Sequence, residues 1–303
     1  MNDATHQRRQ RLIGLALICG TALCFACLDS TAKYLNHFVD TIMVVWARYA
    51  GAFVLALIIS NPVSRPGLMV SQRPWLQIGR SLLLLGSTVF NFVALIWLQL
   101  DQTTAIMFST PFLVAVLSGP ILGEWVGWRR WCAILVGFAG VLLVTRPGFG
   151  GIHPAALLCV LSVLSYGFYM IATRLLARCD SSETTLFYSN TVGVVLMSAI
   201  VPFFWITPHD PYIIGLMVLT GALGSIGHYL LIIAHRLAPP SVLAPFLYTQ
   251  LIWVIALGYF VFGDLPNHWT IAGAGIVVAS GLYLLHRERR VGKAVTATGA
   301  AIE

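Results

Sequence analysis

Three charged side chains interrupt the apolar stretches near the start of the chain: Asp29, Lys33 and Arg48. A charge at bilayer depth costs about 2.5–3.5 kcal/mol on insertion scales, so such residues should be paired or functional. Asp29 and Lys33 are four residues apart on one helix face, and Arg48 falls at similar depth in the next apolar stretch. Two interpretations stay open: a structural ion cluster that ties two helices together, or a coupling group in which Asp29 binds a proton or faces a substrate.

A second group of candidates consists of polar and aromatic side chains in the middle of apolar stretches. An unsatisfied amide or hydroxyl is costly in lipid and should face a partner, a substrate or water. The aromatic rings would stack on a flat molecule, while Asn91 and Gln250 would supply hydrogen bonds. Packing between helices is the alternative for every member, including His228, whose imidazole titrates near neutrality. The predicted substrate-binding residues are Asn91, Ser109, Tyr166, Tyr169, His228, Tyr248, Gln250 and Trp253.

The sequence contains few motifs for metal binding, cofactor binding or catalysis. Cys24 and Cys27 form a CxxC inside an apolar helix with no second pair and no nearby His, so we predict no metal site. No phosphate-binding glycine loop with its lysine and no nucleophile motif is present, so we expect no cofactor and no enzyme. Pro111 and Pro245 fall inside apolar stretches, where each removes a backbone hydrogen bond and acts either as a gating hinge or as a static kink.

The composition indicates where these residues must be held. Of 303 residues, 58% are hydrophobic and 10% charged, against about 25% charged in a soluble domain. Mean hydropathy is +0.84. A membrane-spanning helix needs about 20 apolar residues, and ten windows qualify. They lie near residues 12–35, 40–60, 76–98, 103–122, 130–145, 154–174, 184–206, 212–234, 240–262 and 268–286.

The distribution of Lys and Arg predicts the orientation of these helices. With the N-terminus inside, fifteen cations from Arg8 to Lys293, Arg80 among them, fall on the inside, and Arg146 alone lies in an outside loop. Cytoplasmic loops carry such an excess. We therefore expect a multi-pass inner-membrane protein with cytoplasmic tails at 1–11 and 287–303. The net charge of +7 then reflects topology, so lipid and not nucleic acid is the expected surrounding.

The chain also resembles itself at an offset of 141 residues. The matches pair Lys33 with Arg174, Gly86 with Gly227, Trp128 with Trp269, Ala133 with Ala274 and Gly140 with Gly281. They predict two five-helix units, 12–145 and 154–286. A five-helix unit repeated in tandem enters the membrane the second time from the opposite side. Such inverted repeats are common in secondary transporters that work by alternating access.

Several motifs resemble the EamA-type, ten-helix branch of the drug/metabolite transporter superfamily. They are Trp46-Ala47-Arg48-Tyr49, Arg80, the run from Thr103-Thr104-Ala105 through Pro111 to Gly123-Glu124, and its echo from Ala238-Pro239-Pro240-Ser241 to Gly263-Asp264. The resemblance implies an all-α membrane protein that carries small metabolites through a central cavity lined by helices one, three, four, six, eight and nine. The sequence is similar to the riboflavin and S-adenosylmethionine uptake groups.

These observations favour a secondary transporter of a small-molecule substrate, with a flat neutral vitamin such as riboflavin as the first expectation. A carrier of S-adenosylmethionine-like compounds, or an exporter of amino acids or opine metallophores, is the alternative. A channel or a non-transporting membrane protein is a second alternative, although neither a filter loop nor a ring of charges is visible in the sequence. Proton coupling and a homodimer are hypotheses that the sequence leaves open.

Overall fold

The computed structural model describes residues 2–60, 66–122, 128–145, 153–176, 179–237 and 246–299. Within these ranges the chain contains helices and turns and no strand, so the predicted all-α fold is confirmed. The helices are α1 (Asn2–Leu35), α2 (Thr41–Ser60), η1 (Pro66–Met69), α3 (Pro74–Ala94), α4 (Leu100–Met107), α5 (Thr110–Leu122), α6 (Trp128–Thr145), α7 (Ala155–Leu176), α8 (Ser182–Ile200), η2 (Val201–Phe204), α9 (Pro211–Leu237), α11 (Gln250–Phe262) and α12 (His268–Gly299).

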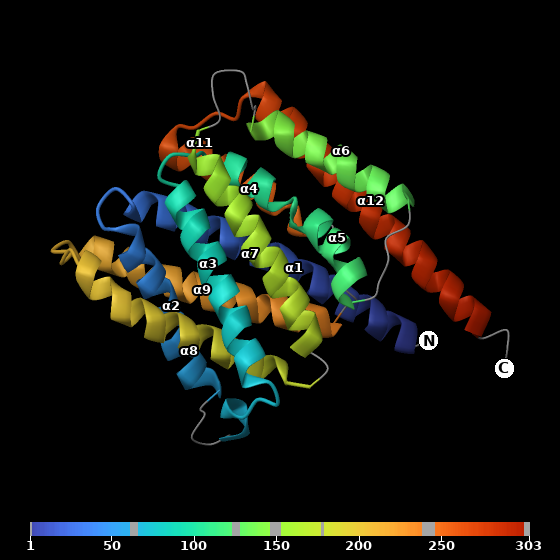
Figure 1. Ribbon diagram of the computed structural model, residues 1–303, viewed down its shortest axis with the longest axis horizontal. Helices are drawn as coiled ribbons and strands as arrows, with labels where there is room; N and C mark the ends of the chain where they lie inside the picture. The colour runs from blue at the N-terminus through green and yellow to red at the C-terminus, as the bar shows by residue number, and fades with distance from the viewer. Residues whose placement is uncertain are drawn as a thin grey trace.

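Six stretches of the described residues are long and apolar enough to cross a membrane, and they belong to α1, α2, α3, α7, α8 and α9. Both terminal helices extend into the predicted tails, since α1 begins at Asn2 and α12 continues to Gly299. The start of α1 and the end of α12 lie on the same side of the molecule (Figure 1). We call this side the terminal end.

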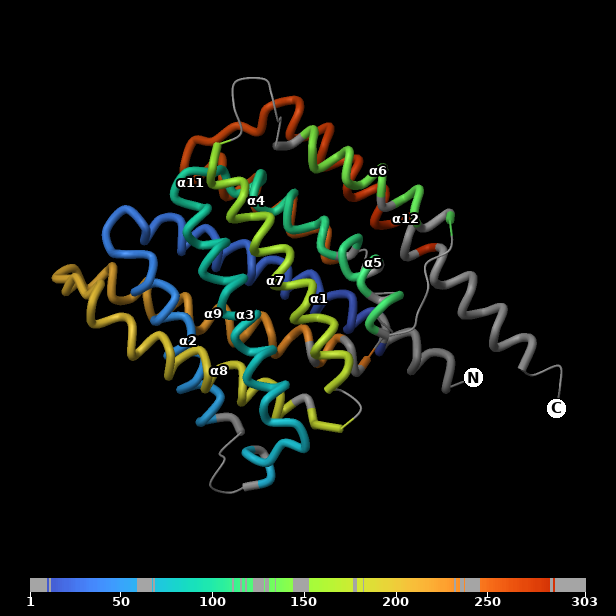
Figure 2. Tube along the Cα trace, in the orientation of Figure 1, coloured from blue at the N-terminus to red at the C-terminus, as the bar shows by residue number. Residues whose placement is uncertain are grey.

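Helices from the two halves of the sequence pack against each other. The α1 helix packs along α9, α3 packs along α7 and α8, and α6 packs along α12. Figure 2 shows α6 and α12 together along one edge of the molecule. At the α2–α9 crossing, a Cβ atom on Gly51 would lie 2.8 Å from the Gly221 Cα atom. Small residues allow this close approach, which in lipid supplies much of the packing energy between helices.

The fourth predicted span is interrupted. α4 ends at Met107 and α5 starts at Thr110, and the Ser109 and Thr110 hydroxyls donate to the Ile106 and Met107 carbonyl oxygens at 2.6 and 2.7 Å. Pro111 is the second residue of α5, where proline removes no intrahelical hydrogen bond. The structure therefore places Pro111 just after an interruption and not inside a continuous helix.

The ninth predicted span shows a similar turn before α11, where Thr249 donates to the Phe246 carbonyl oxygen at 2.6 Å. The two interruptions meet, because the Phe108 and Tyr248 rings are in edge contact with centroids 4.9 Å apart. The described residues begin again at 246, so Pro245 lies outside them.

Asp180, in the connection between α7 and α8, joins the two halves at the terminal end. Its carboxylate accepts hydrogen bonds from the Ser71 hydroxyl, from the Gln72 backbone N–H at 3.0 Å and from the Gln77 side-chain amide at 2.8 Å. Desolvation by itself raises the pKa of Asp180, but these three hydrogen bonds outweigh it and hold the pKa below its ordinary value. The carboxylate form is therefore the one that links the α2–α3 segment to the α7–α8 connection.

This shift predicts a pH dependence of stability. Because the folded-state pKa is depressed, the stabilisation is present above the unfolded pKa of about 3.9 and is lost as the pH falls through the folded value. We expect Asp180→Asn to melt a few degrees below wild type at neutral pH, with the difference shrinking below about pH 4. Melting curves of both proteins in detergent across this range test it. A difference that stays constant down to acidic pH would contradict the assignment to the carboxylate.

Candidate functional site

A cluster of polar side chains forms where α1, α2 and α3 meet inside the bundle. The Asn91 side-chain amide donates to the Asp29 carboxylate at 3.3 Å, and the Arg48 guanidinium donates to the Thr88 hydroxyl. Arg48 also lies over the ring of Phe92, 5.7 Å from its centroid, and within electrostatic range of Asp29. Asp29, Arg48 and Asn91 are half-buried, so the cluster keeps some accessible surface.

Helices α7 and α9 add aromatic and imidazole groups to this cluster. The Tyr166 and Tyr169 rings are stacked, with centroids 5.3 Å apart and planes 24° from parallel. The His228 ring meets the edge of Phe25 at 5.1 Å. Arg48 lies within electrostatic range of both Tyr166 and His228. We call Asp29, Arg48, Thr88, Asn91, Tyr166, Tyr169 and His228 the central polar cluster.

Arg80 supports the cluster from the terminal side. Its side chain is 1% exposed, and its guanidinium lies over the Tyr169 ring at 4.9 Å. It donates to the Thr173 hydroxyl at 3.1 Å, to the Thr185 carbonyl oxygen at 2.6 Å and to the Ser189 hydroxyl. The sequence indicated Arg80 as one of the inside cations and as part of the family resemblance, without a partner for its side chain. The structure shows that it joins α3 to α7 and α8 and positions one of the stacked tyrosines.

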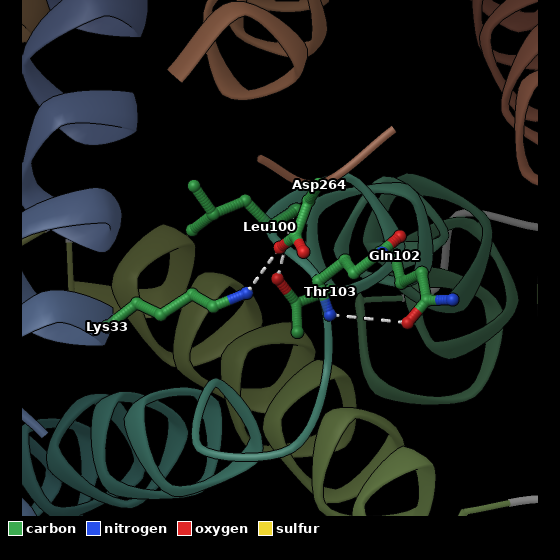
Figure 3. A network of polar contacts seen from close by, with 6 residues as sticks. Lys33, Leu100, Gln102, Thr103 and Asp264 are labelled. Atoms are coloured by element: carbon green, nitrogen blue, oxygen red, sulfur yellow. Dashed lines mark hydrogen bonds and ion pairs between the residues drawn. The ribbon is translucent and has the colours of Figure 1, made fainter. Parts of the chain in front are cut away.

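Lys33 does not join the cluster as expected from its spacing to Asp29. Its ammonium pairs with the Asp264 carboxylate at 2.8 Å, linking α1 to the segment that follows α11 (Figure 3). The spacing of Lys33 from Asp29 determines the helix face on which Lys33 lies, but it does not determine which segment packs there. The carboxylate that pairs with Lys33 comes from the segment after α11. Figure 3 shows this pair beside the first turn of α4, where Thr103 donates to the Leu100 carbonyl oxygen. The predicted three-residue ion cluster is thus split into two separate sites.

The remaining predicted residues lie at or next to the two interruptions. Ser109 is used at the α4–α5 interruption, and Tyr248 packs on Phe108 before α11. Gln250 is the first residue of α11, and Trp253 follows it on the same helix with 38% of its surface exposed. Four of the eight predicted binding residues, Asn91, Tyr166, Tyr169 and His228, are therefore together, and the other four are near the two interruptions.

The chemistry available in the central polar cluster is binding and proton exchange. It offers one carboxylate, one guanidinium, an amide and a stacked pair of phenol rings, which together can recognise a flat ring that carries charged groups. Within the described residues, no three His, Cys, Asp or Glu side chains lie close enough to hold a metal ion. Thr88 was missed by the sequence analysis, because a threonine in an apolar stretch usually bonds to its own helix.

Comparisons with known proteins agree with this architecture. A solved crystal structure superposes with a TM-score of 0.64 at 16% identity, covering 94% of this chain and 99% of the other. The S-adenosylmethionine uptake transporter of Rickettsia bellii is 27% identical over 291 residues, which is 96% of this chain and 98% of that protein. The riboflavin transporter of Rhizobium johnstonii is 25% identical over 284 residues, 92% of this chain and 93% of that protein.

The strongest assignment comes from the family profile, which matches twice and covers most of the chain. The EamA-like transporter family matches residues 12–146 and again residues 153–285. Each match covers five of the ten predicted spans, and together they include every residue of the central polar cluster. The chain is a multi-pass membrane protein and belongs to the EamA-like transporter family.

Proposed function

We propose that this transporter carries a flat heteroaromatic metabolite bearing both a positive and a negative charge, of the S-adenosylmethionine type, across the bacterial inner membrane. The observation that carries the proposal is that Arg48 lies within electrostatic range of both Asp29 and Tyr166, whose ring is stacked on that of Tyr169. A carboxylate and a guanidinium complement an amino acid moiety, and the tyrosines complement a flat base. The relatives named as S-adenosylmethionine uptake transporters support this chemistry.

Riboflavin is the second candidate, because it is a flat ring and a relative carries that name. A neutral vitamin would use the tyrosines and Asn91 but would leave the Asp29 and Arg48 charges without partners of opposite sign on the substrate. This mismatch reverses the preference that the side-chain inventory of the sequence suggested.

The proposed mechanism is alternating access, with both termini in the cytoplasm and the units 12–145 and 154–286 as the inverted repeats. In this orientation the Lys33–Asp264 pair closes the periplasmic side and Asp180 joins the halves at the cytoplasmic side. Asp29 is the proposed proton-coupling group, because it is the carboxylate of the central polar cluster and its surroundings change when substrate replaces water.

The test is uptake by cells that have no route of their own for these compounds. We expect labelled S-adenosylmethionine to accumulate above the vector control, a protonophore to abolish accumulation, and Asp29→Asn to lower the rate about tenfold or more, equivalent to about 1.4 kcal/mol. Asp40→Asn is the matched control, since its carboxylate caps α2 through the Ile42 N–H at 2.8 Å, which an amide oxygen can replace. Accumulation of riboflavin alone would favour the second candidate, and accumulation of neither would reject both.

A further inference from the structure

The Lys33 ammonium lies where α1, the start of α4 and the segment after α11 come together (Figure 3). It pairs with the Asp264 carboxylate at 2.8 Å, and the two side chains are 13% and 27% exposed. The ammonium also lies over the Phe262 ring, 4.8 Å from its centroid. These contacts attach α1 to the end of α11.

A second carboxylate, that of Asp101, lies beside the same ion pair. Asp101 belongs to the first turn of α4 and is within electrostatic range of both Lys33 and Asp264. It is 5% exposed, and one of its carboxylate oxygens has no hydrogen-bond partner in the part of the chain that the structure describes. Because that oxygen is buried, a partner for it must come from the protein itself. A buried carboxylate without its counter-charge costs free energy, so two carboxylates gain from one cation here.

Of these three charged groups, the ammonium has the most freedom to move. Asp264 is held by the end of α11, where Gly263 has a left-handed φ of 69° and the Asp264 N–H donates to the Gly258 carbonyl oxygen at 3.0 Å. Asp101 is held in the helical backbone of α4. Lys33 carries its charge and three donors on a flexible four-carbon stem. A change of partner therefore requires movement of the lysine side chain.

The two carboxylates belong to different units of the chain. Lys33 and Asp101 lie in the first family match, residues 12–146, and Asp264 lies in the second, residues 153–285. The Lys33–Asp264 pair therefore connects the two units, whereas a Lys33–Asp101 pair stays within one. When the units separate at this end, as alternating access requires, the first pair breaks. The lysine charge then needs another partner, because an unpaired charge at this depth is costly.

We infer that Asp101 is the second partner of Lys33: the ammonium bonds to Asp264 while this side of the transporter is closed and transfers to Asp101 when it opens. Asp264 then stabilises the closed state and Asp101 stabilises the open state. Removal of the two carboxylates therefore shifts the same equilibrium in opposite directions. The inference rests on the alternating access of the proposed function, but not on the identity of the substrate.

The test measures how fast a cysteine in the central polar cluster reacts with a membrane-impermeant thiol reagent added from the periplasmic side. The parent protein is the full chain in right-side-out membrane vesicles, with its six native cysteines replaced by alanine and Asn91→Cys as the reporter. We expect Asp264→Asn to react about threefold or more faster than the parent, and Asp101→Asn about threefold or more slower. Asp210→Asn is the matched control and should react like the parent, since it keeps an oxygen that accepts from the Tyr212 N–H at 2.8 Å.

The two substitutions distinguish failure of this inference from failure of the proposed function. A faster reaction in Asp264→Asn without a slower one in Asp101→Asn would overturn the exchange of partners alone. An unchanged rate in Asp264→Asn would overturn both the exchange and the alternating access proposed at this pair.

Asp101→Ala keeps the test decisive should the amide of Asp101→Asn impair folding, because alanine leaves no buried polar atom and is favoured in helices. It should slow the reaction as the asparagine variant does. Lys33→Met then separates a role through the ammonium from a role in packing. Added to Lys33→Met, the Asp101→Ala substitution should leave the rate unchanged, whereas equal slowing in both backgrounds would overturn the exchange.

Discussion

Arg80→Met is expected to lower the free energy of unfolding by about 3 kcal/mol, because hydrogen bonds to a charged group contribute about 1.5–3 kcal/mol each and are not additive. Arg80 is 1% exposed and bonds to Thr173, Thr185 and Ser189. Methionine replaces most of the stem but none of the donors, so α3 loses its polar links to α7 and α8. Denaturation in mixed detergent micelles and the yield of monodisperse protein both measure this loss.

Two further variants separate the bonding of Arg80 from its charge. Arg73→Met removes an exposed arginine at the start of the same helix, whose backbone N–H bond to the Ser71 hydroxyl at 3.0 Å is retained, and it should be neutral. Arg80→Lys keeps the charge but loses the planar fork that reaches two helices at once, so it should fall between wild type and Arg80→Met. Equal stability of Arg80→Met and Arg73→Met would show that the network contributes nothing.

Gly51→Ala is expected to destabilise the protein by about 1–3 kcal/mol, the usual range for a methyl group forced into a packed contact. The added Cβ atom would lie 2.8 Å from the Gly221 Cα atom, and one on Gly221 would lie 2.6 Å from the Gly51 Cα atom. Both neighbours are backbone atoms, which cannot rotate away as a side chain can. The α2 and α9 helices must therefore separate along their whole contact.

The same substitution at Gly79 in α3 is the control, because a Cβ atom there meets nothing within 4 Å. Gly79→Ala should be neutral or slightly stabilising, since alanine is favoured over glycine in a helix by about 1 kcal/mol. Unfolding of the two variants under identical detergent conditions compares a methyl group in contact with a methyl group in open space. Equal stability of the two would mean that the α2–α9 crossing relaxes freely.

The helical architecture could be predicted from the sequence because a bilayer imposes a length and a composition on each span. The residue at which the fourth span is interrupted was harder to predict from the sequence. Pro111 indicated a bend in the fourth span, but the helix breaks three residues earlier, at Phe108, because the last carbonyls of α4 are satisfied there by the Ser109 and Thr110 hydroxyls. Local chemistry of this kind depends on rotamers that a pattern of residue types does not specify.

The partners of charged residues were the least predictable part of the candidate site. Lys33 and Asp29 share a helix face, yet the partner of Lys33 is 231 residues away. Arg80 lies near a helix start, where arginine usually extends toward the membrane surface, and nothing in its neighbourhood in sequence distinguishes it from such a residue. In each case the missing information is which helices are neighbours.

The pairing of α1 with α9 has a consequence for how the protein is made. The Thr21 hydroxyl donates to the Gly227 carbonyl oxygen at 3.3 Å across 206 residues of chain. At synthesis rates of about 5–20 residues per second, α1 leaves the ribosome about 10–40 s before its partner. During that interval the Lys33 side chain lies in the insertion machinery or the bilayer without Asp264, which follows it by 231 residues. Asp29 gains Asn91 earlier, because Asn91 follows it by only 62 residues. Assembly of this transporter is therefore a post-insertion step, at which quality-control proteases can act.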